Sequence, residues 1–145
     1  MSEADVLVGD EIAGSIGRGL LIFLGIGKHD TPRNIEWMVD KIVNLRIFET
    51  QEGKMDKSLL DIGGALLVVS QFTLYGDCRK GRRPSFSEAM DAPAAKSFFE
   101  LFVERAKLKV INVQTGVFQA SMRVSLTNDG PVTLLLDSAP SSSSS

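Results

Sequence analysis

Two short polar clusters carry the groups in this sequence that could take part in a reaction. The first is Ser70–Leu74, which reads Ser-Gln-Phe-Thr-Leu and directly follows an apolar run. A strand that stops burying apolar side chains and then presents polar ones is a common place for a site, because the strand holds those groups rigidly. In an extended strand Gln71 and Thr73 would share one face, and Ser70 and Phe72 the other. Ordinary strand-end polarity, satisfied by cross-strand hydrogen bonds, is the alternative interpretation.

The first cluster has no obvious general base to activate a hydroxyl nucleophile. The single histidine, His29, lies in a Lys-His-Asp turn that no motif connects with Ser70 or Thr73, so a Ser-His-Asp triad has no support. One cysteine, Cys78, and one histidine also leave no set of zinc ligands. We therefore expect no metal and no other cofactor.

The second cluster is the segment Asn128–Pro131, which reads Asn-Asp-Gly-Pro. A hairpin turn is its simplest interpretation, since these residue types favour turns. The Gly130-Pro131 bond is also a candidate for the cis form, which about 5–6% of X–Pro bonds adopt in folded proteins. A cis Gly-Pro would orient two backbone carbonyls in the same direction and form a rigid wall without side chains.

A basic segment follows the first cluster. Four of the sixteen Lys and Arg residues lie within five positions, at Arg79, Lys80, Arg82 and Arg83. They form either a solvated loop or a set of phosphate contacts, which fix position without reading sequence. Phe86 could stack on an unpaired base or anchor the loop by burial. The net charge of −2 excludes a polycation that binds nucleic acid over its whole surface, so any RNA contact must be local.

The elements that would position these clusters follow from apolar periodicity and turn residues. We predict strands at Ala4–Val8, Glu11–Ile16, Leu20–Ile26, Leu45–Phe48, Ala65–Leu74, Val117–Leu126 and Val132–Asp137. Amphipathic helices are predicted from Thr31-Pro32 onward, with Ile35, Met38, Val39 and Ile42 inward, and over Ala94–Lys109, with Phe98, Leu101, Phe102 and Val103 inward. Gly9-Asp10 should form a two-residue hairpin turn between the first two strands, because glycine tolerates positive φ. Glu49–Asp61 and Gly76–Ser87 should be connections. The order predicts one mixed α/β (α+β) domain, with a largely antiparallel sheet or β-barrel-like core and two helices packed on it.

The sequence contains no targeting or membrane segment that we can recognise. Its start has neither a basic region nor an apolar core of the kind found in signal peptides. The longest apolar run, Leu20–Ile26, is far shorter than the roughly 20 residues of a membrane helix. We expect a cytoplasmic protein with no membrane partner.

Taken together, and in this order along the chain, the two clusters resemble the signatures of the D-aminoacyl-tRNA deacylase (D-tyrosyl-tRNA deacylase) family. The resemblance extends to Asp137 through the intervening segments Gly17–Gly25, Leu45–Phe48, Arg83–Phe86 and Asn112–Phe118. Single motifs of this kind are weak, but the ordered set is specific. It implies an enzyme that hydrolyses the ester of D-aminoacyl-tRNA, and of mischarged glycyl-tRNA, to free amino acid and tRNA.

The resemblance also implies a homodimer with active sites at the subunit interface. Each subunit would insert Gly130-Pro131 into its partner's pocket, where the carbonyls would exclude L-amino acids. Ser70, Gln71, Phe72 and Thr73 would line the site, with backbone N–H groups near Phe72 and Thr73 binding the substrate carbonyl oxygen. We favour attack by water, assisted by the substrate's 2′-hydroxyl, over attack by Thr73.

By the same resemblance the basic residues and Phe86 would contact the tRNA. The alternatives are a nucleic-acid-binding protein on this scaffold without efficient catalysis, and a dimeric interaction domain with neither activity.

The chain departs from the family pattern at its beginning. The family has a further strand before the Ala4–Val8 region, with an arginine that would brace the Gly-Pro turn, where this sequence reads Met1-Ser2-Glu3. Either the start was assigned at an internal position, or the protein lacks that strand. We expect residues 1–137 to form the family domain, with that strand missing from this sequence. Residues 138–145, which are rich in serine, should be a disordered tail.

Overall fold

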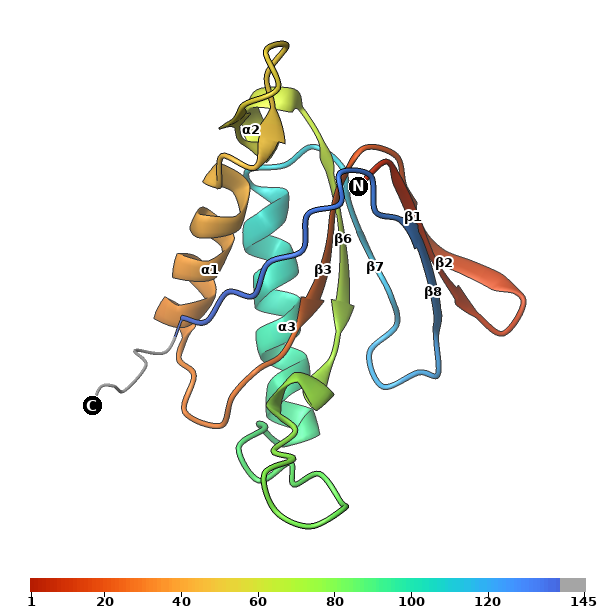
Figure 1. The fold of residues 1–145 in the computed structure, drawn as a ribbon. Helices are drawn as coiled ribbons and strands as arrows, with labels where there is room; N and C mark the ends of the chain where they lie inside the picture. Colours follow the sequence, from red (N-terminus) through yellow and green to blue (C-terminus); the bar gives the residue numbers. More distant parts are fainter. Residues whose placement is uncertain (139–145) are drawn as a thin grey trace.

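Two three-stranded sheets form the centre of the computed structural model, which describes residues 1–138 (Figure 1). The first is antiparallel and has the order β2 (Glu11–Ile16), β1 (Glu3–Val8), β8 (Arg123–Thr127). The second is parallel and has the order β3 (Gly19–Leu24), β6 (Ala65–Ser70), β7 (Val113–Thr115). A small antiparallel pair joins β4 (Phe48–Glu49) and β5 (Met55–Lys57).

The strand β6 lies between two apolar layers. Leu66 and Val68 belong to a cluster shared with the helices, whereas Leu67 and Val69 belong to the cluster beneath the antiparallel sheet. All four side chains are at most 1% exposed. A strand buried on both faces reads as an unbroken apolar run, which explains why this segment was recognisable from sequence.

Two long helices cover one face of the parallel sheet (Figure 1). They are α1 (Pro32–Asn44) and α3 (Ala92–Lys107), and a short helix, α2 (Leu59–Ile62), follows β5. Proline stands near the start of each long helix, where a missing N–H leaves no intrahelical bond unmade. The N–H of Thr31 donates to the Asn34 side chain at 2.8 Å and caps the first turn of α1.

The structure confirms the predicted mixed α/β domain with two amphipathic helices packed on a sheet. The sheets of residues 1–138 do not close into a barrel. The Gly9-Asp10 turn, the β3 strand and the start of α1 lie where the sequence placed them. In α3, Phe102 and Val103 are buried as expected, and Phe99 is buried in addition.

Several predicted boundaries were wrong. The strand predicted to run to Leu74 ends at Ser70, because a 3₁₀ helix, η1 (Phe72–Tyr75), follows it. The connection Glu49–Asp61 contains β5 and the start of α2, and β7 was missed. In the region Val117–Leu126 only the residues from Arg123 onward form a strand.

The last predicted strand, Val132–Asp137, is extended chain without a ladder. Its apolar residues suit a strand, but within residues 1–138 no strand lies beside it to pair with. Of the predicted serine-rich tail, only Ser138 is among the described residues, and its hydroxyl accepts a bond from Asn34. Among residues 1–138 we find no helix with both the length and the apolar character needed to cross a membrane.

Candidate active site at the end of strand β6

The Ser70–Thr73 segment turns sharply at the end of β6. The Gln71 N–H still donates to the Leu24 carbonyl at 2.8 Å, which continues the pairing with β3 by one residue. The chain then winds into η1, so the expected alternation of side chains between two strand faces is wrong. The turn is fixed to the centre of the sheet but opens towards solvent, since Phe72 is 57% exposed.

Two backbone donors at the start of η1 have no protein acceptor. Phe72 and Thr73 are the first residues of this 3₁₀ helix, and the first N–H groups of a helix cannot bond within it. No other acceptor for either group is found among residues 1–138. Two adjacent N–H groups without an acceptor can form a small electropositive site of the kind that stabilises a carbonyl oxygen as it gains negative charge.

The polar side chains of the turn contact each other rather than a base. The Gln71 side-chain amide donates a hydrogen bond to the Thr73 hydroxyl oxygen. An amide cannot remove a proton from that hydroxyl. His29 lies near Asp30 and Glu88, and its charge favours the ionised form of both carboxyl groups. No hydrogen bond among residues 1–138 connects His29 with Ser70 or Thr73. The geometry therefore provides positioned donors without an activated nucleophile.

Aromatic contacts hold this turn from two sides. The Phe72 and Phe86 rings meet edge to face, with centroids 5.0 Å apart, and a Cβ on Gly76 would lie 3.0 Å from the Phe86 ring. On the other side the Tyr75 side chain covers the backbone of Gly25 and Gly27. A Cβ added at Gly25 would lie 3.2 Å from the Tyr75 ring, and one added at Gly27 would lie 2.7 Å from the Tyr75 hydroxyl oxygen. Burial, with the charges of two nearby aspartates, raises the pKa of Tyr75 to about 12.

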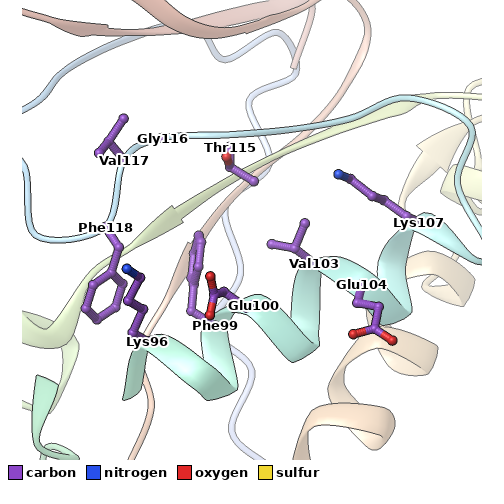
Figure 2. A pocket seen from close by; sticks show the side chains of 10 residues that line it. All are labelled: Lys96, Phe99, Glu100, Val103, Glu104, Lys107, Thr115, Gly116, Val117 and Phe118. Atoms are coloured by element: carbon purple, nitrogen blue, oxygen red, sulfur yellow. The ribbon is translucent and has the colours of Figure 1, made fainter. Parts of the chain in front are cut away.

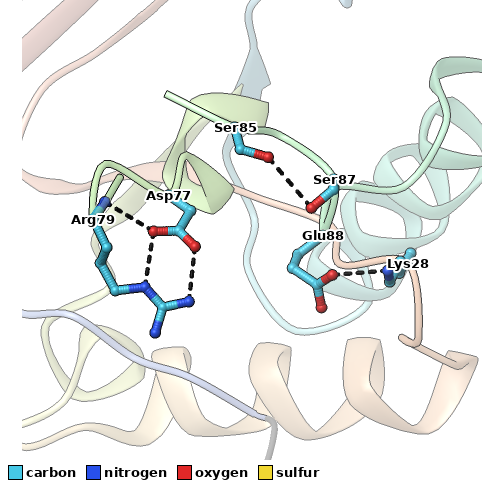
Figure 3. Close-up of polar contacts among 6 residues, drawn as sticks. All are labelled: Lys28, Asp77, Arg79, Ser85, Ser87 and Glu88. Carbon is cyan, nitrogen blue, oxygen red and sulfur yellow. Dashed lines mark hydrogen bonds and ion pairs between the residues drawn. The ribbon is translucent and has the colours of Figure 1, made fainter. Parts of the chain in front are cut away.

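The basic loop leaves the turn directly after η1. Its base is closed by two backbone hydrogen bonds between Asp77 and Ser85, of 2.7 and 2.9 Å. Arg79 folds back onto Asp77, with its Nε and Nη2 atoms 2.9 and 2.8 Å from the two carboxylate oxygens (Figure 3). These hydrogen bonds lower the pKa of Asp77 to about 2. In the same view Lys28 pairs with Glu88 at 2.7 Å.

The other predicted tRNA contacts, Lys80, Arg82 and Arg83, are exposed on the same loop. No ion pair for these three is found within residues 1–138. Arg79 differs from them because Asp77 already neutralises it.

The Gly130-Pro131 bond is cis, but this turn does not lie at the β6 site. Thr127 pairs with Glu3 at the end of β8, and the neighbouring Met1 bonds to Gly19 at the start of β3. Ser70 stands at the opposite end of the same sheet (Figure 1). Six residues of β6 separate the two ends by about 16 Å, at roughly 3.3 Å per residue.

A loop missed by sequence reasoning flanks the site on the β7 side. The Gly116 N–H donates to the Val68 carbonyl at 3.0 Å, and further along the loop Gln119 is the one non-glycine residue of the described chain with positive φ, at 66°. Phe118 packs on Phe99, with ring centroids 5.9 Å apart.

Figure 2 shows the hollow beside this loop, lined by residues of α3 and the segment 115–118. Its volume is about 470 Å³. Figure 2 also shows four charged side chains along this part of α3, at Lys96, Glu100, Glu104 and Lys107. Among residues 1–138 no cluster of His, Cys, Asp and Glu could hold a metal ion.

Comparison with known proteins gives consistent relatives over nearly the whole chain. The family model described as D-Tyr-tRNA(Tyr) deacylase matches residues 1–137. A D-aminoacyl-tRNA deacylase of Thermotoga petrophila is 55% identical over 139 residues, covering 96% of this chain and 93% of that protein. The protein of the same name from Kosmotoga olearia is 59% identical over 138 residues, covering 95% and 93%.

Two solved structures share the fold. One, described as c-Myc DNA Unwinding Element Binding Protein, is 41% identical with a TM-score of 0.90 and covers 97% of this chain and 95% of its own. The other, described as a probable eukaryotic D-amino acid tRNA deacylase, has a TM-score of 0.72 and covers 86% of this chain and 89% of its own. At 17% identity the second supports the fold alone.

Proposed function

Because the chain belongs to the D-Tyr-tRNA(Tyr) deacylase family, a family of hydrolases, we propose that it cleaves the ester of D-aminoacyl-tRNA to free D-amino acid and tRNA. One observation supports the assignment of the site: the Phe72 and Thr73 N–H groups, just after the end of β6, have no acceptor among residues 1–138. These donors bind the ester carbonyl oxygen and stabilise the charge that develops on it. The substrate class places the enzyme in the cytoplasm, where tRNA is charged.

The protein positions the ester, and the RNA assists the chemistry. An aminoacyl ester is already activated, so orientation and charge stabilisation supply much of what hydrolysis needs. Thr73 accepts a hydrogen bond from Gln71 and has no base to ionise it, which disfavours a threonine nucleophile. Water attacks the carbonyl, with the neighbouring 2′-hydroxyl of the terminal ribose as its proton-relay partner.

Selection against L-amino acids comes from a second copy of the chain. Gly130-Pro131 follows β8, whose last pairs lie near the start of β3, whereas Ser70 ends β6 at the opposite end of the parallel sheet, so in one subunit the turn and the site are too far apart to enclose a single α-carbon. In a homodimer the partner's turn enters the site, and its backbone excludes an L side chain while D-amino acids and glycine fit. Exclusion suits this task, because the two enantiomers offer the same groups for attraction.

Contact with the tRNA acceptor end is made by the basic loop. Lys80, Arg82 and Arg83 are exposed and carry charges that no side chain of residues 1–138 neutralises, as phosphate contacts require. Phe86 supports Phe72 from beneath, so the ring anchors the turn and we assign it no base to stack on.

Incubation with D-tyrosyl-tRNA and L-tyrosyl-tRNA tests the activity. We expect release of tyrosine from the D-substrate only. Equal hydrolysis of both, or of neither, would contradict the proposal.

Mixed dimers test the origin of the selectivity. Pro131→Ala protein should hydrolyse the L-substrate. Phe72→Pro protein should leave the L-substrate intact and hydrolyse the D-substrate about 10²–10³ times more slowly. When Pro131→Ala protein is co-expressed with an excess of Phe72→Pro protein, most Pro131→Ala subunits pair with a Phe72→Pro subunit. The active site of the Pro131→Ala subunit then receives a Gly130-Pro131 turn from its partner. Protection of the L-substrate should then return while D-hydrolysis continues; persistent L-hydrolysis would place the wall in the same subunit.

A second candidate function is nucleic-acid binding without efficient catalysis. It is favoured by the similarity to the structure described as c-Myc DNA Unwinding Element Binding Protein. It predicts salt-sensitive binding of single-stranded DNA or RNA through the basic loop and no ester cleavage. Absence of both activities would leave a dimeric interaction domain.

A further inference from the structure

The 3₁₀ helix η1 is too short to hold its shape without support from the rest of the fold. It contains four residues, Phe72–Tyr75. The Leu74 N–H donates to the Gln71 carbonyl at 3.2 Å, and the Gly76 N–H donates to the Thr73 carbonyl at 2.9 Å. Fixing the backbone angles of a first helical turn costs more free energy than its hydrogen bonds return. Packing against other elements must therefore determine how η1 continues from β6.

Tyr75 is the residue of η1 that packs on the fold. The other three side chains of η1 are exposed, whereas that of Tyr75 is partly buried. The contact between Phe72 and Phe86 joins two rings that are 57% and 37% exposed, so it holds the turn less firmly. Burial is the largest cause of the raised pKa of Tyr75, about 12, and the hydroxyl stays protonated at neutral pH. Tyr75 is thus an uncharged anchor for the turn.

The surface beneath Tyr75 is backbone without side chains. A Cβ added at Gly27 would lie 2.7 Å from the Tyr75 hydroxyl oxygen, and one added at Gly25 would lie 3.2 Å from the ring. Neither glycine has a positive φ, so the local backbone conformation does not require glycine. The space that the Tyr75 side chain occupies does require it.

This backbone surface is itself held in place. It follows β3 directly, and the Ile26 carbonyl accepts a hydrogen bond from the Met90 N–H at 3.0 Å. The Gly27 N–H donates to the Asp30 carboxylate at 2.8 Å, which closes the turn after the strand. A ring packed on a fixed surface restricts the position of the backbone that carries it, so Tyr75 ties η1 to the end of β3.

We propose that Tyr75 is a positioning residue for ester hydrolysis, because its side chain, seated on the two glycines, orients the Phe72 and Thr73 N–H groups. This inference rests on the proposed function, in which those N–H groups bind the carbonyl oxygen of the substrate. Oxyanion donors act only from the correct position, and a displacement of about 1 Å can slow a reaction about 10²-fold. Tyr75 acts through η1 rather than on the substrate.

Single-turnover deacylation of D-tyrosyl-tRNA at saturating enzyme tests this role. Tyr75→Ala should react about 10²-fold more slowly, with unchanged affinity for uncharged tRNA, because the basic loop keeps its charges. Tyr75→Phe keeps the ring and should restore most of the rate. Phe48→Leu, which alters a buried ring of β4 outside the site, controls for lost stability and should leave the rate unchanged. Equal rates for the wild type and Tyr75→Ala would overturn the proposal.

Two double variants trace the effect through η1. Gly27→Ala places a Cβ against the Tyr75 hydroxyl and should slow the reaction, but it should add little to Tyr75→Ala, where that space is empty. Tyr75→Ala should also lower the rate less in Phe72→Pro protein than in the wild type, since one of the two donors is already absent. Additive losses in either pair would overturn the proposal.

Amide hydrogen exchange gives a measurement that does not depend on activity. The Leu74 and Gly76 N–H groups, which are bonded within the turn, should exchange faster in Tyr75→Ala and not in Phe48→Leu. Unchanged exchange in Tyr75→Ala would overturn the proposal. An inactive wild-type chain would contradict the proposed function, whereas an active wild type with an equally active Tyr75→Ala variant would contradict the positioning role alone.

Discussion

Replacement of Phe72 by proline removes one proposed oxyanion donor while changing little else in the backbone. Phe72 is the first residue of η1, and its N–H bonds to no acceptor among residues 1–138. Proline is tolerated at this position because the lost N–H was unpaired and the ring favours a helical φ. Gln71, which precedes it, has φ −142° and ψ 81°, outside the helical region that a following proline disfavours.

The matched control is Phe72→Ala, which keeps the N–H. Both variants lose the edge-to-face contact with Phe86, so their difference isolates the donor. Loss of one preorganised oxyanion donor lowers kcat by about 10²–10³-fold, or about 2.7–4 kcal/mol of transition-state stabilisation. We therefore expect Phe72→Pro to deacylate D-tyrosyl-tRNA about 10²–10³ times more slowly than Phe72→Ala, the loss typical of a single donor.

Single-turnover deacylation at saturating enzyme measures the chemical step directly. Thermal unfolding of both variants checks that they fold alike, and binding of uncharged tRNA checks that the basic loop is unchanged. If the two variants react at the same rate while both remain folded, the Phe72 N–H does not bind the developing oxyanion. The site would then need another source of charge stabilisation.

Three further predictions concern the loops around the site. The double variant Arg82→Ala, Arg83→Ala should bind tRNA with a weaker salt dependence. For single strands the slope of the log binding constant against log salt concentration should fall by about 0.7 per lost phosphate contact. Arg79→Ala should change this slope less, because Arg79 already pairs with Asp77. Gln119→Gly should raise the free energy of unfolding by up to about 1.6 kcal/mol in urea titrations. Left-handed backbone costs a non-glycine residue about 1–2 kcal/mol, and the greater entropy of glycine in the unfolded chain offsets about 0.4–1 kcal/mol of that gain. A lower free energy of unfolding in the variant would contradict the strain. The pKa of Asp77 is lowered from 3.8 to about 2. Its contribution to loop stability is therefore complete above pH 3.8 and is lost as the pH falls towards 2. NMR titration of the Asp77 carboxyl group, in the wild type and in Arg79→Ala, measures this shift.

The sequence predicted best the elements whose neighbours lie close along the chain. The Gly9-Asp10 hairpin and the Thr31-Pro32 helix start depend on residues within one turn of each other, and both are confirmed. The predicted strand at Val132–Asp137 failed for the opposite reason. Its apolar residues satisfy strand propensity, but a strand also needs a hydrogen-bonding neighbour, which no local pattern supplies.

The site itself was only partly predictable. Ser-Gln-Phe-Thr marked the end of a buried strand correctly. The assumption of an extended strand, however, hid the 3₁₀ winding that leaves the Phe72 and Thr73 N–H groups without an acceptor among residues 1–138. The change from strand to 3₁₀ helix depends on Tyr75 packing over Gly25 and Gly27, a contact made across some 50 positions of sequence. The Asp77–Arg79 pair was visible as adjacent charges, but its fork geometry was not.

The distance between the two motifs gives the strongest argument for an active site shared between subunits. Both belong to one ordered family pattern, which suggests a common task. Yet Gly130-Pro131 follows β8 near the start of β3, whereas Ser70 ends β6, about 16 Å further along the parallel sheet. The strands oppose their approach within one chain, because Thr127 is paired with β1 and Gln71 with β3 by backbone hydrogen bonds. If both act on one esterified α-carbon, two chains must supply them. A monomer with full discrimination between D- and L-tyrosyl-tRNA would therefore remove Gly130-Pro131 from the mechanism.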